Sequence, residues 1–337
     1  MPKLRLSFIS AFNERVDPLM KGIVEAEGIE LVPTYSHPSE TFWRQLKLQE
    51  FEVGEMSMSS YLIARERGFD MIALPVFPSR RLFHTEISYH GDSGIQKPQD
   101  LVGKRFGVGE YQQTAALWER GILEHDFGVS QYKLHWFMER TEELSHGGQT
   151  GFTPPKGISF QRIPPDKSMA SMLVSHELDA AAINSPWKNM PTFIGRSHQI
   201  PGVGGDWSKV KELFSDRMAE GKRFFQKWEF LPVNHTYMIR GDIYEKYPWT
   251  AFNLYSGFVK AKAYFNTKLV DSIPSGLFFG KEYLTMTQEI FGNDPYIYGV
   301  KGNRKMLETL IDFSHEQGLI KSKPKIEDLF ARSTLDL

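Results

Sequence analysis

The sequence contains no cysteine among its 337 residues. Disulfide bonds, zinc–thiolate sites, iron–sulfur clusters and thiol nucleophiles are therefore excluded. An excess of charge of one sign is also missing, because 40 basic residues balance 41 acidic ones and give a formal net charge of −1. This balance argues against a nucleic-acid binder or a polybasic membrane binder. Any site for an anion must then be a local cluster of cations.

Long apolar runs are absent as well, since no stretch approaches the ~20 residues that span a membrane. The first ten residues alternate as in a strand and lack the charged and apolar regions of a signal peptide. We therefore expect a cytoplasmic protein, or a periplasmic one if a leader was removed. We expect neither a nucleic-acid partner nor a membrane span, and a homo-oligomer is compatible with the sequence.

Strand and helix patterns alternate along the chain, which indicates an α/β fold with mostly parallel sheets. A chain of 337 residues exceeds what one core usually supports, so we expect two lobes. The first lobe would comprise residues 1–84 plus 236–337, with C-terminal helices as a cover, and the second residues 85–235. Two crossover strands near 82–89 and 231–239 would connect them. A ligand cleft between the lobes would lie at the carboxyl ends of parallel strands.

The apolar periodicity predicts the elements of both lobes. Strands are expected at Leu4–Ser10, Ile29–Thr34, Val53–Met56, Met71–Val76, Gly103–Val108, Leu134–Met138, Ile158–Ile163, Leu178–Ile183 and Leu231–Ile239. Helices are expected from Asp17 onward and over residues 40–49, 61–67, 111–127, 167–175, 208–228, 247–266 and 303–317.

Three serines follow the predicted strand that contains Glu55, at the start of the next helix. The unpaired amides of a helix N-terminus, together with hydroxyl donors, form a cradle for an anion. Simple N-capping is the alternative, but three hydroxyls exceed what capping needs. The candidate substrate-binding residues of this segment are Glu55, Ser57, Ser59 and Ser60.

A second helix start occupies the equivalent place in the other lobe. Its candidate substrate-binding residues are Tyr111, Gln112, Thr114 and Trp118, although Trp118 could instead be plain core. Glu110, just before them, is a candidate catalytic residue that could orient a hydroxyl or carry a proton. Capping of the helix by Glu110 is at least as good an interpretation.

Cations and histidines cluster near the predicted crossovers. A proline-flanked turn over residues 75–78 stiffens the chain just before Arg80 and His84, which suits a site for a small anion. His235 lies on the other crossover, and we take both histidines as candidate catalytic residues. The alternative is two hinge histidines with structural hydrogen bonds. His84 and Glu86 share a strand face by period two, so a divalent metal is conceivable, but we favour a metal-free site without a cofactor.

Motifs along nearly the whole chain resemble those of the 4,5-dihydroxyphthalate decarboxylase family, which has a type 2 periplasmic-binding-protein-like fold. The matching stretches are Glu-Met-Ser-Met-Ser-Ser at 55–60, Pro-Val-Phe-Pro-Ser-Arg at 75–80 with His84, Gly-Glu-Tyr-Gln-Gln-Thr-Ala at 109–115 with Trp118, Asn-His-Thr at 234–236, Arg240, Tyr-Pro-Trp at 247–249, Asp-Pro-Tyr-Ile-Tyr-Gly at 294–299, Asn-Arg-Lys at 303–305 and Glu-Gln-Gly-Leu at 316–319.

This resemblance implies loss of carbon dioxide from a hydroxylated aromatic carboxylate. Protonation of the ring carbon by a general acid, with His84 before His235 as the candidate, would drive the reaction. Arg80, together with Arg15 and Arg304, would hold the retained carboxylate or a phenolate. A tight grip on the departing carboxylate would stabilise the ground state more than the transition state, so an apolar wall should face that group.

Two other functions remain open at this point. A solute-binding receptor for a small organic anion, feeding an ABC importer, would use the same fold and the same cradles. A cytoplasmic ligand sensor is a third function, but it needs a partner domain that the sequence does not show. An enzyme would release carbon dioxide from the compound that it binds, whereas a receptor would bind the compound and leave it unchanged.

Overall fold

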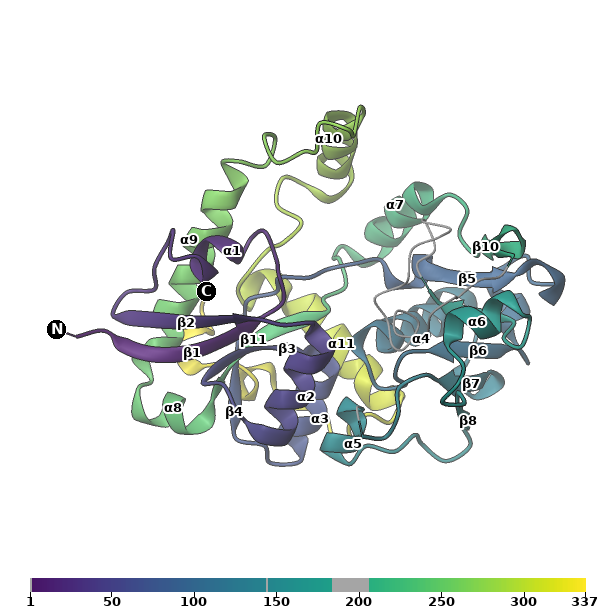
Figure 1. Ribbon diagram of the computed structural model, residues 1–337, viewed down its shortest axis with the longest axis horizontal. Coiled ribbons are helices and arrows are strands. Elements are labelled where there is room, and N and C mark those ends of the chain that lie inside the picture. The colour runs from purple at the N-terminus through teal and green to yellow at the C-terminus, as the bar shows by residue number, and fades with distance from the viewer. Residues whose placement is uncertain (1, 144, 184–205) are drawn as a thin grey trace. The chain divides into compact units, whose positions relative to one another are not determined.

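The structure is a computed structural model that describes residues 2–143, 145–183 and 206–337 (Figure 1). The contacts within the chain divide it into two compact units. Unit 1 comprises Met1–Arg81, Lys227–Thr309 and Lys323–Leu337, and unit 2 comprises Leu82–Gln226 and Leu310–Ser322. The ligand cleft that the sequence predicts between two lobes stays a prediction.

Unit 1 is built on a five-stranded sheet in the order β2-β1-β3-β11-β4. Its strands are β1 (Leu4–Ser10), β2 (Ile29–Tyr35), β3 (Val53–Ser57), β4 (Met71–Leu74) and β11 (His235–Arg240). β1 runs parallel to β2 and β3, whereas β11 runs antiparallel to β3 and β4. The first residue of β11 therefore lies at the edge where its neighbours end, since His235 pairs with Ser57.

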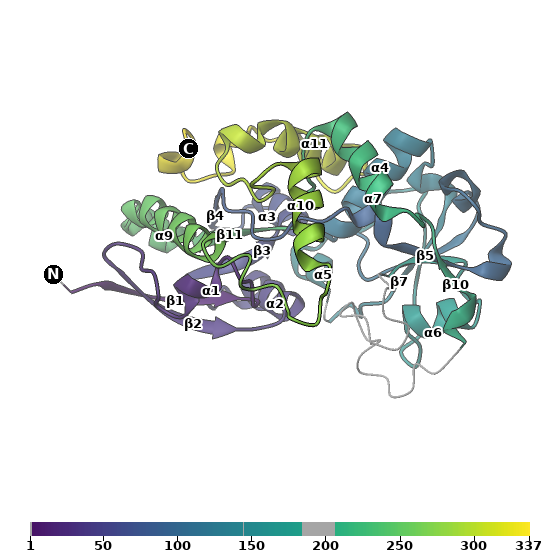
Figure 2. The same ribbon diagram turned by 90° about the horizontal axis from the view of Figure 1, so that it is seen from above.

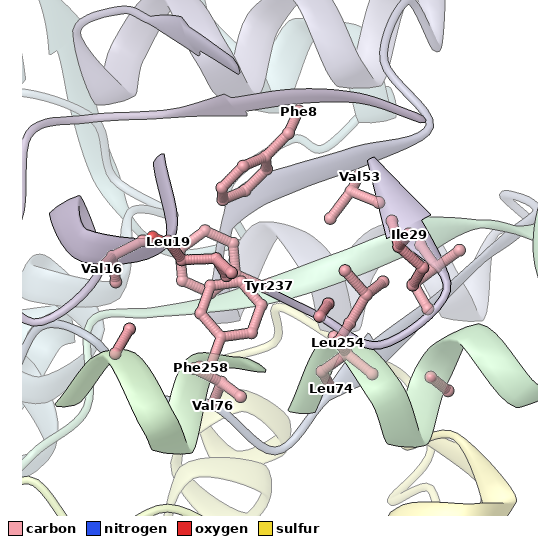
Figure 3. Packing of buried hydrophobic residues seen from close by; sticks show 14 of the residues in the cluster. Phe8, Val16, Leu19, Ile29, Val53, Leu74, Val76, Tyr237, Leu254 and Phe258 are labelled. Atoms are coloured by element: carbon pink, nitrogen blue, oxygen red, sulfur yellow. The ribbon is translucent and has the colours of Figure 1, made fainter. Parts of the chain in front are cut away.

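Helices cover both faces of this sheet. On one face lie α1 (Asp17–Met20) and α9 (Trp249–Asn266), and the rings of Phe8 and Tyr237 pack on Phe258 of α9 (Figure 3). On the other face lies α2 (Pro38–Leu48), which approaches β3 so closely that a Cβ on Gly54 would come within 2.8 Å of the Gln45 side chain. The unit also contains α3 (Met58–Glu66), α8 (Gly241–Lys246) and α10 (Gly280–Phe291).

Unit 2 contains a six-stranded sheet in the order β10-β5-β9-β6-β7-β8. Its strands are β5 (Ile87–His90), β6 (Arg105–Val108), β7 (His135–Met138), β8 (Ser159–Arg162), β9 (Ala180–Ala182) and β10 (Val210–Glu212). β6 runs parallel to β7 and β9, and β7 runs parallel to β8. β5 and β10 form an antiparallel edge and lie side by side in Figure 2.

The helices of unit 2 are α4 (Thr114–Phe127), α5 (His146–Thr150) and α6 (Met169–Val174). α4 ends at Gly128 in the left-handed conformation, as its sequence predicts. α7 (Arg217–Trp228) and α11 (Arg304–Glu316) contribute residues to both units. Gly121 of α4 allows the Phe313 ring to pack directly on the helix backbone, because a Cβ there would overlap that ring.

The prediction of one helix over residues 208–228 is wrong. Val210–Glu212 is a strand that pairs with β5, and the helix begins only at Arg217. The Asp216 side chain accepts a hydrogen bond from the Ala219 amide at 2.9 Å and so fixes this start. The spacing of apolar residues predicts one helix because it gives no sign of the boundary between the strand and the helix.

The expected extended crossover over residues 82–89 is also wrong in part. Phe83–Glu86 is a 3₁₀ helix, and the strand begins only at Ile87. All four residues of this turn are buried, which an alternating strand on one sheet face would not achieve. His84 and Glu86 therefore do not share a strand face. Among the described residues, no helix combines the length and apolar character needed to cross a bilayer.

Candidate functional site

The ends of three strands and the start of a fourth lie at one edge of the unit 1 sheet. β1 ends at Ser10, β3 ends at Ser57 and β4 ends at Leu74, while β11 begins at His235. Because polar residues follow β1 and β3 and one begins β11, their side chains gather at this edge. We call the group formed by Arg15, Glu55, the serines 57, 59 and 60, and His235 the unit 1 site.

A glutamate–histidine pair lies at the centre of the unit 1 site. His235 Nδ1 is 2.6 Å from Glu55 Oε1, and the carboxylate accepts the ring N–H. Both residues are buried, and the edge of the Phe42 ring packs against the imidazole at a centroid distance of 4.8 Å. In the described part of the chain, the hydrogen bond of this imidazole runs through Nδ1 and not through Nε2. The pairing therefore fixes one ring nitrogen and leaves the other available.

The second oxygen of Glu55 is fixed by the end of β1. Oε2 accepts a hydrogen bond from the Ala11 amide at 2.8 Å and one from the Ser10 hydroxyl at 3.3 Å. Ser10 Oγ also lies 2.7 Å from the Tyr237 hydroxyl. Burial, with a smaller contribution from Glu55, raises the pKa of Tyr237 well above its usual value, so the phenol stays protonated. The carboxylate is thus held in one orientation toward His235.

The serine segment forms the start of α3. Ser57 occupies the N-cap position without a side-chain capping bond, and Ser57 Oγ lies 3.3 Å from Ser59 Oγ. The hydroxyl of Ser60 is buried without a hydrogen-bond partner. Simple capping therefore does not account for the Ser60 hydroxyl, which lies at the helix start and can donate a hydrogen bond to an anion.

Arg15 is the cation of the unit 1 site. Its guanidinium lies 3.6 Å from the centroid of the Tyr296 ring, and Nη2 donates to the carbonyl of Pro78 at 3.0 Å. Nη1 contacts Glu14 at 2.5 Å, whereas the buried Nε has no hydrogen-bond partner. The aromatic ring and the carbonyl orient the planar fork, and Nε remains as a donor for a ligand.

Arg80 lies in unit 1 but is occupied by main-chain carbonyls. Its guanidinium donates to Leu231 O and Ile297 O, both at 2.8 Å, and to the Asn303 side chain. Burial lowers the pKa of Arg80 to about 10, so the side chain is charged at neutral pH. These hydrogen bonds join the segment of Arg80 to the segments around Leu231 and Ile297, so Arg80 stabilises the fold of unit 1. Arg304 is different again: it is half-exposed on α11 and pairs with Glu327 at 2.8 Å.

His84 lies in unit 2, in an apolar environment. Its Nε2 is 2.6 Å from Glu220 Oε1, and the rings of Phe214 and Phe224 pack on it at centroid distances of 5.3 and 5.4 Å. The side chain is 0% exposed and Nδ1 is buried without a partner. Burial lowers the pKa of His84, although Glu220 opposes the shift. We therefore describe it as a neutral imidazole that donates Nε2–H to the carboxylate.

This burial predicts an acid-sensitive fold. The pKa of His84 is lower in the folded protein than in the unfolded chain, where it is about 6.5. The unfolded chain thus binds more protons below pH 6.5, and the unfolding free energy falls there by up to about 1.4 kcal/mol per pH unit. Urea unfolding at pH 7.5, 6.0 and 5.0 measures the unfolding free energy at each pH. The His84→Gln variant should show a smaller decrease of this free energy toward low pH. Equal slopes for both proteins would contradict the assignment.

Glu110 of unit 2 is enclosed by a charged cluster. Arg140 Nη1 lies 3.1 Å from Glu110 Oε1, the His146 amide donates to the same oxygen at 2.8 Å, and Gln112 donates to the other oxygen. Burial by itself raises the pKa of Glu110, but His146 and Arg140 outweigh it and hold the pKa below its usual range. Glu110 is therefore a carboxylate at neutral pH.

Sequence reasoning missed Arg140 and His146. Arg140 follows β7 by two residues, and His146 is the first residue of α5, a helix of five residues. Arg140 Nη1 lies 3.3 and 3.2 Å from the two ring nitrogens of His146. The position of Arg140 at the end of a predicted parallel strand was the available signal, since polar residues there meet those after the neighbouring strand.

The remaining candidates of unit 2 are buried at the start of α4. Tyr111 donates its hydroxyl to Gln131 at 2.5 Å, and Arg120 lies 3.9 Å from the centroid of its ring. Trp118 packs on the Phe313 ring at 5.6 Å, as a core residue would. Tyr111 and Gln112 also line a pocket of about 250 Å³ within unit 2, together with Ser145 and Phe152. Thr114 is the first, buried residue of α4.

The structure therefore distributes the candidates over both units. Unit 1 contains Arg15, Glu55, Ser57, Ser59, Ser60 and His235, of which Glu55 contacts His235 and Ser57 contacts Ser59, whereas Arg80 and Arg304 have other partners. Unit 2 contains His84, Glu110, Tyr111, Gln112, Thr114 and Trp118. In the part of the chain that the structure describes, no three His, Asp or Glu side chains are grouped as metal ligands. The absence of a metal or cofactor stays a prediction.

Comparison with solved structures identifies the fold. The structure is similar to the periplasmic aliphatic sulphonate binding protein SsuA from Escherichia coli, with a TM-score of 0.53 and 14% identity over 98% of this chain and 92% of that one. A ligand-binding component of an ABC-type import system from Staphylococcus aureus gives a TM-score of 0.50 at 12% identity, over 100% and 98% of the two chains. The periplasmic-binding-protein-like fold is therefore confirmed.

Sequence comparison gives the family. A 4,5-dihydroxyphthalate decarboxylase from Comamonas testosteroni is 29% identical over 339 residues, which cover 100% of this chain and 99% of the relative. One from Pseudomonas putida is 36% identical over 181 residues, 53% of this chain and 70% of the relative. No family model matches the chain. The chain belongs to the 4,5-dihydroxyphthalate decarboxylase family, and the prediction of an enzyme of the carboxy-lyase class is confirmed.

Proposed function

We propose that this protein decarboxylates a hydroxylated aromatic dicarboxylate such as 4,5-dihydroxyphthalate without an oxidation step. The names of the two relatives support the substrate class. The observation that carries the chemistry is the buried pair of Glu55 and His235, whose contact of 2.6 Å leaves one imidazole nitrogen available. Such a pair suits a general acid, because the carboxylate holds the ring in one orientation.

The proposed reaction needs no organic cofactor. The ring hydroxyls increase electron density at the carbon that bears the carboxylate. His235, carrying a proton on each ring nitrogen, transfers the Nε2 proton to that carbon and keeps the Nδ1 proton bonded to Glu55. The carbon–carbon bond then breaks, its electron pair restores the aromatic ring, and carbon dioxide leaves. His235 takes up a proton from water before the next turnover. A positioned general acid typically contributes ~10²–10⁴-fold to the rate.

His235 is a better candidate for the acid than His84. His84 is fully buried, its Nε2 is bonded to Glu220, and burial lowers its pKa. A fully buried imidazole between two aromatic rings cannot reach a substrate carbon to protonate it. His235 instead lies at the carboxyl edge of a sheet, beside serine hydroxyls and the start of a helix.

We assign Arg15 and the serine segment to the carboxylate that stays on the ring. Arg15 Nε is a buried donor without a partner, and the Ser60 hydroxyl is another. The departing carboxylate loses its charge in the transition state, so a strong cation on it would slow the reaction. The apolar edge of Phe42 beside His235 suits that position better.

Arg15 supplies a test of binding. We expect Arg15→Gln to raise KM by about 10–100-fold with little change in kcat, because a hydrogen bond to a charged group is worth about 1.5–3 kcal/mol. Arg5→Gln is the matched control, since the Arg5 side chain is 70% exposed on β1. Steady-state kinetics measures both variants. An unchanged KM in Arg15→Gln would remove this arginine from the substrate site.

Turnover against binding separates the enzyme from a solute receptor of the same fold. Purified protein is mixed with 4,5-dihydroxyphthalate and with a panel of mono- and dihydroxybenzoates, while carbon dioxide release and calorimetric binding are followed in parallel. We expect release from the dicarboxylate and none from benzoates that lack ring hydroxyls. Tight binding without release from any compound would favour a receptor for aromatic anions and would overturn the proposal.

A further inference from the structure

A projecting segment of unit 1 has no part in the proposed reaction. We call residues 267–292 the arm; it contains α10 and connects α9 to the segment before α11. All of its residues are described, and Gly280 is the only one that is buried. In Figure 1, α10 stands away from the sheet of unit 1. A segment with so little buried surface gains little stability from its own unit.

Large apolar side chains are exposed on the arm. Phe278 is 89% exposed, Phe279 is 67% exposed and Tyr283 is 51% exposed, and Val270 and Leu277 are about half-exposed beside them. Monomeric soluble proteins rarely expose contiguous apolar groups of this size. The stretch Ser272–Gly280 moreover carries no charge. This concentration marks the arm as a surface that another molecule covers.

The helix of the arm also needs external support. α10 has 12 residues, and its N-cap, Phe279, makes no side-chain capping bond. An isolated helix of this length is marginal in water. Its first residue is covered by the arm itself, since a Cβ on Gly280 would meet Ile273 at 2.3 Å and Leu277 at 3.3 Å. A partner that covers the apolar side would supply the missing packing energy.

A second exposed apolar surface lies on the same unit. Trp249, Phe252 and Val259 of α9 are 42%, 47% and 37% exposed. Phe252 lies three residues after Trp249 and seven before Val259, which places all three on one side of the helix. The other side of α9 packs on the sheet through Leu254 and Phe258 (Figure 3). Unit 1 thus carries both an apolar arm and an apolar helix face.

We propose that two copies of this chain exchange arms, so that the arm of each covers the exposed face of α9 on the other. Such an exchange is self-complementary, as a two-fold dimer requires. The charge pattern favours this occupant, because the arm has two lysines against three acidic residues and offers no basic cluster for an anionic membrane. Two nearly neutral apolar surfaces pair without repulsion.

The area is sufficient for a stable dimer. At ~200 Å² per aromatic side chain, the exposed fractions of Phe278, Phe279 and Tyr283 give about 400 Å² for each arm. Two arms and the surfaces that receive them then bury about 1,600 Å², which is the size of a standard specific interface. Val270 and Leu277 add to this value.

The test is the mass of the protein in solution. Light scattering and sedimentation of the wild type and of the double variant Phe278→Ser/Phe279→Ser are compared from 1 to 100 µM. We expect an even-numbered oligomer for the wild type and a dissociation constant at least 100-fold higher for the variant. Tyr132→Ser in unit 2, where Tyr132 is 50% exposed, is the control and should keep the wild-type mass. A monomeric wild type at 100 µM, or an unchanged mass in the variant, would overturn the proposal.

The absence of cysteine allows a second, independent measurement. Phe278→Cys in a tagged copy is mixed with Phe252→Cys in an untagged copy and treated with a short bis-maleimide. We expect a cross-linked product of the summed mass, whose formation the Phe279→Ser substitution in the tagged copy weakens. No cross-link between copies in a protein that is oligomeric would overturn the pairing of arm and α9. An arm that instead covers its own chain leaves a monomer in both experiments.

Discussion

Replacing His235 with alanine is expected to lower kcat for decarboxylation by ~10²–10⁴-fold, the usual contribution of a general acid. KM should change by only a few fold, because the groups that we assign to substrate binding, Arg15 and the serine segment, are separate from the imidazole. The physical reason is the contact with Glu55 at 2.6 Å, which aligns the ring and leaves Nε2 as its free nitrogen. Steady-state kinetics with 4,5-dihydroxyphthalate measures the effect.

Added imidazole distinguishes a proton donor from a structural histidine. The alanine variant leaves a space of the size of the missing ring beside Phe42, so millimolar imidazole should restore part of the lost rate. His135→Gln, on the exposed start of β7, is the control and should behave like the wild type. If the His235→Ala variant keeps its rate, another group protonates the ring and His84 becomes the next candidate.

Replacing Glu110 with glutamine is expected to lower the unfolding free energy by about 3–5 kcal/mol, the usual loss when one partner of a buried ion pair is removed. Glu110 is fully buried, and its partner Arg140 has a side chain that is 12% exposed. The neutral amide leaves the guanidinium without a counterion and exchanges one of the two acceptor oxygens for a donor group. Urea unfolding followed by circular dichroism measures the loss.

The control for this stability effect is an exposed glutamate of the same unit. Glu124→Gln lies on the solvent side of α4, where a substitution usually changes stability by less than 0.5 kcal/mol. The two variants remove the same charge, so a difference between them reports on burial and on the contact with Arg140. A loss below about 1 kcal/mol in Glu110→Gln would show that the cluster does not support unit 2, and the proton-carrying role would then return to consideration.

Local sequence signals predicted much of the fold because they act within each element. The parallel strands around Phe8, Val53 and Phe106 are short apolar runs with β-α-β connections, and the stop of α4 at Gly128 follows from backbone freedom at glycine. The edge strand β10 and the turn at Phe83–Glu86 were not predictable in this way. Both are set by contacts with distant segments, such as the pairing of Val210 with His90.

In the candidate site, too, local sequence signals identified single residues but not the contacts between distant segments. The position of Glu55 before a helix start, and of His235 on a late strand, pointed to both residues, but their contact joins positions 180 residues apart. Sequence also pointed to Arg80 and His84, because a cation and a histidine near a strand end suit a site. In the structure, Arg80 donates hydrogen bonds to main-chain carbonyls, and the rings of Phe214 and Phe224 pack on His84, so both side chains are enclosed. The burial of these two side chains depends on contacts throughout each unit, so no pattern in the neighbouring sequence predicts it.

The most direct measurement of the central claim is the product formed in heavy water. The protein is incubated with 4,5-dihydroxyphthalate in D₂O, and carbon dioxide and the ring protons of the product are quantified together. The account predicts one carbon dioxide per substrate and one deuterium at the vacated ring carbon of 3,4-dihydroxybenzoate, with His235→Ala forming the same product far more slowly. Recovery of the intact dicarboxylate, bound but unchanged by the wild-type protein, would contradict it.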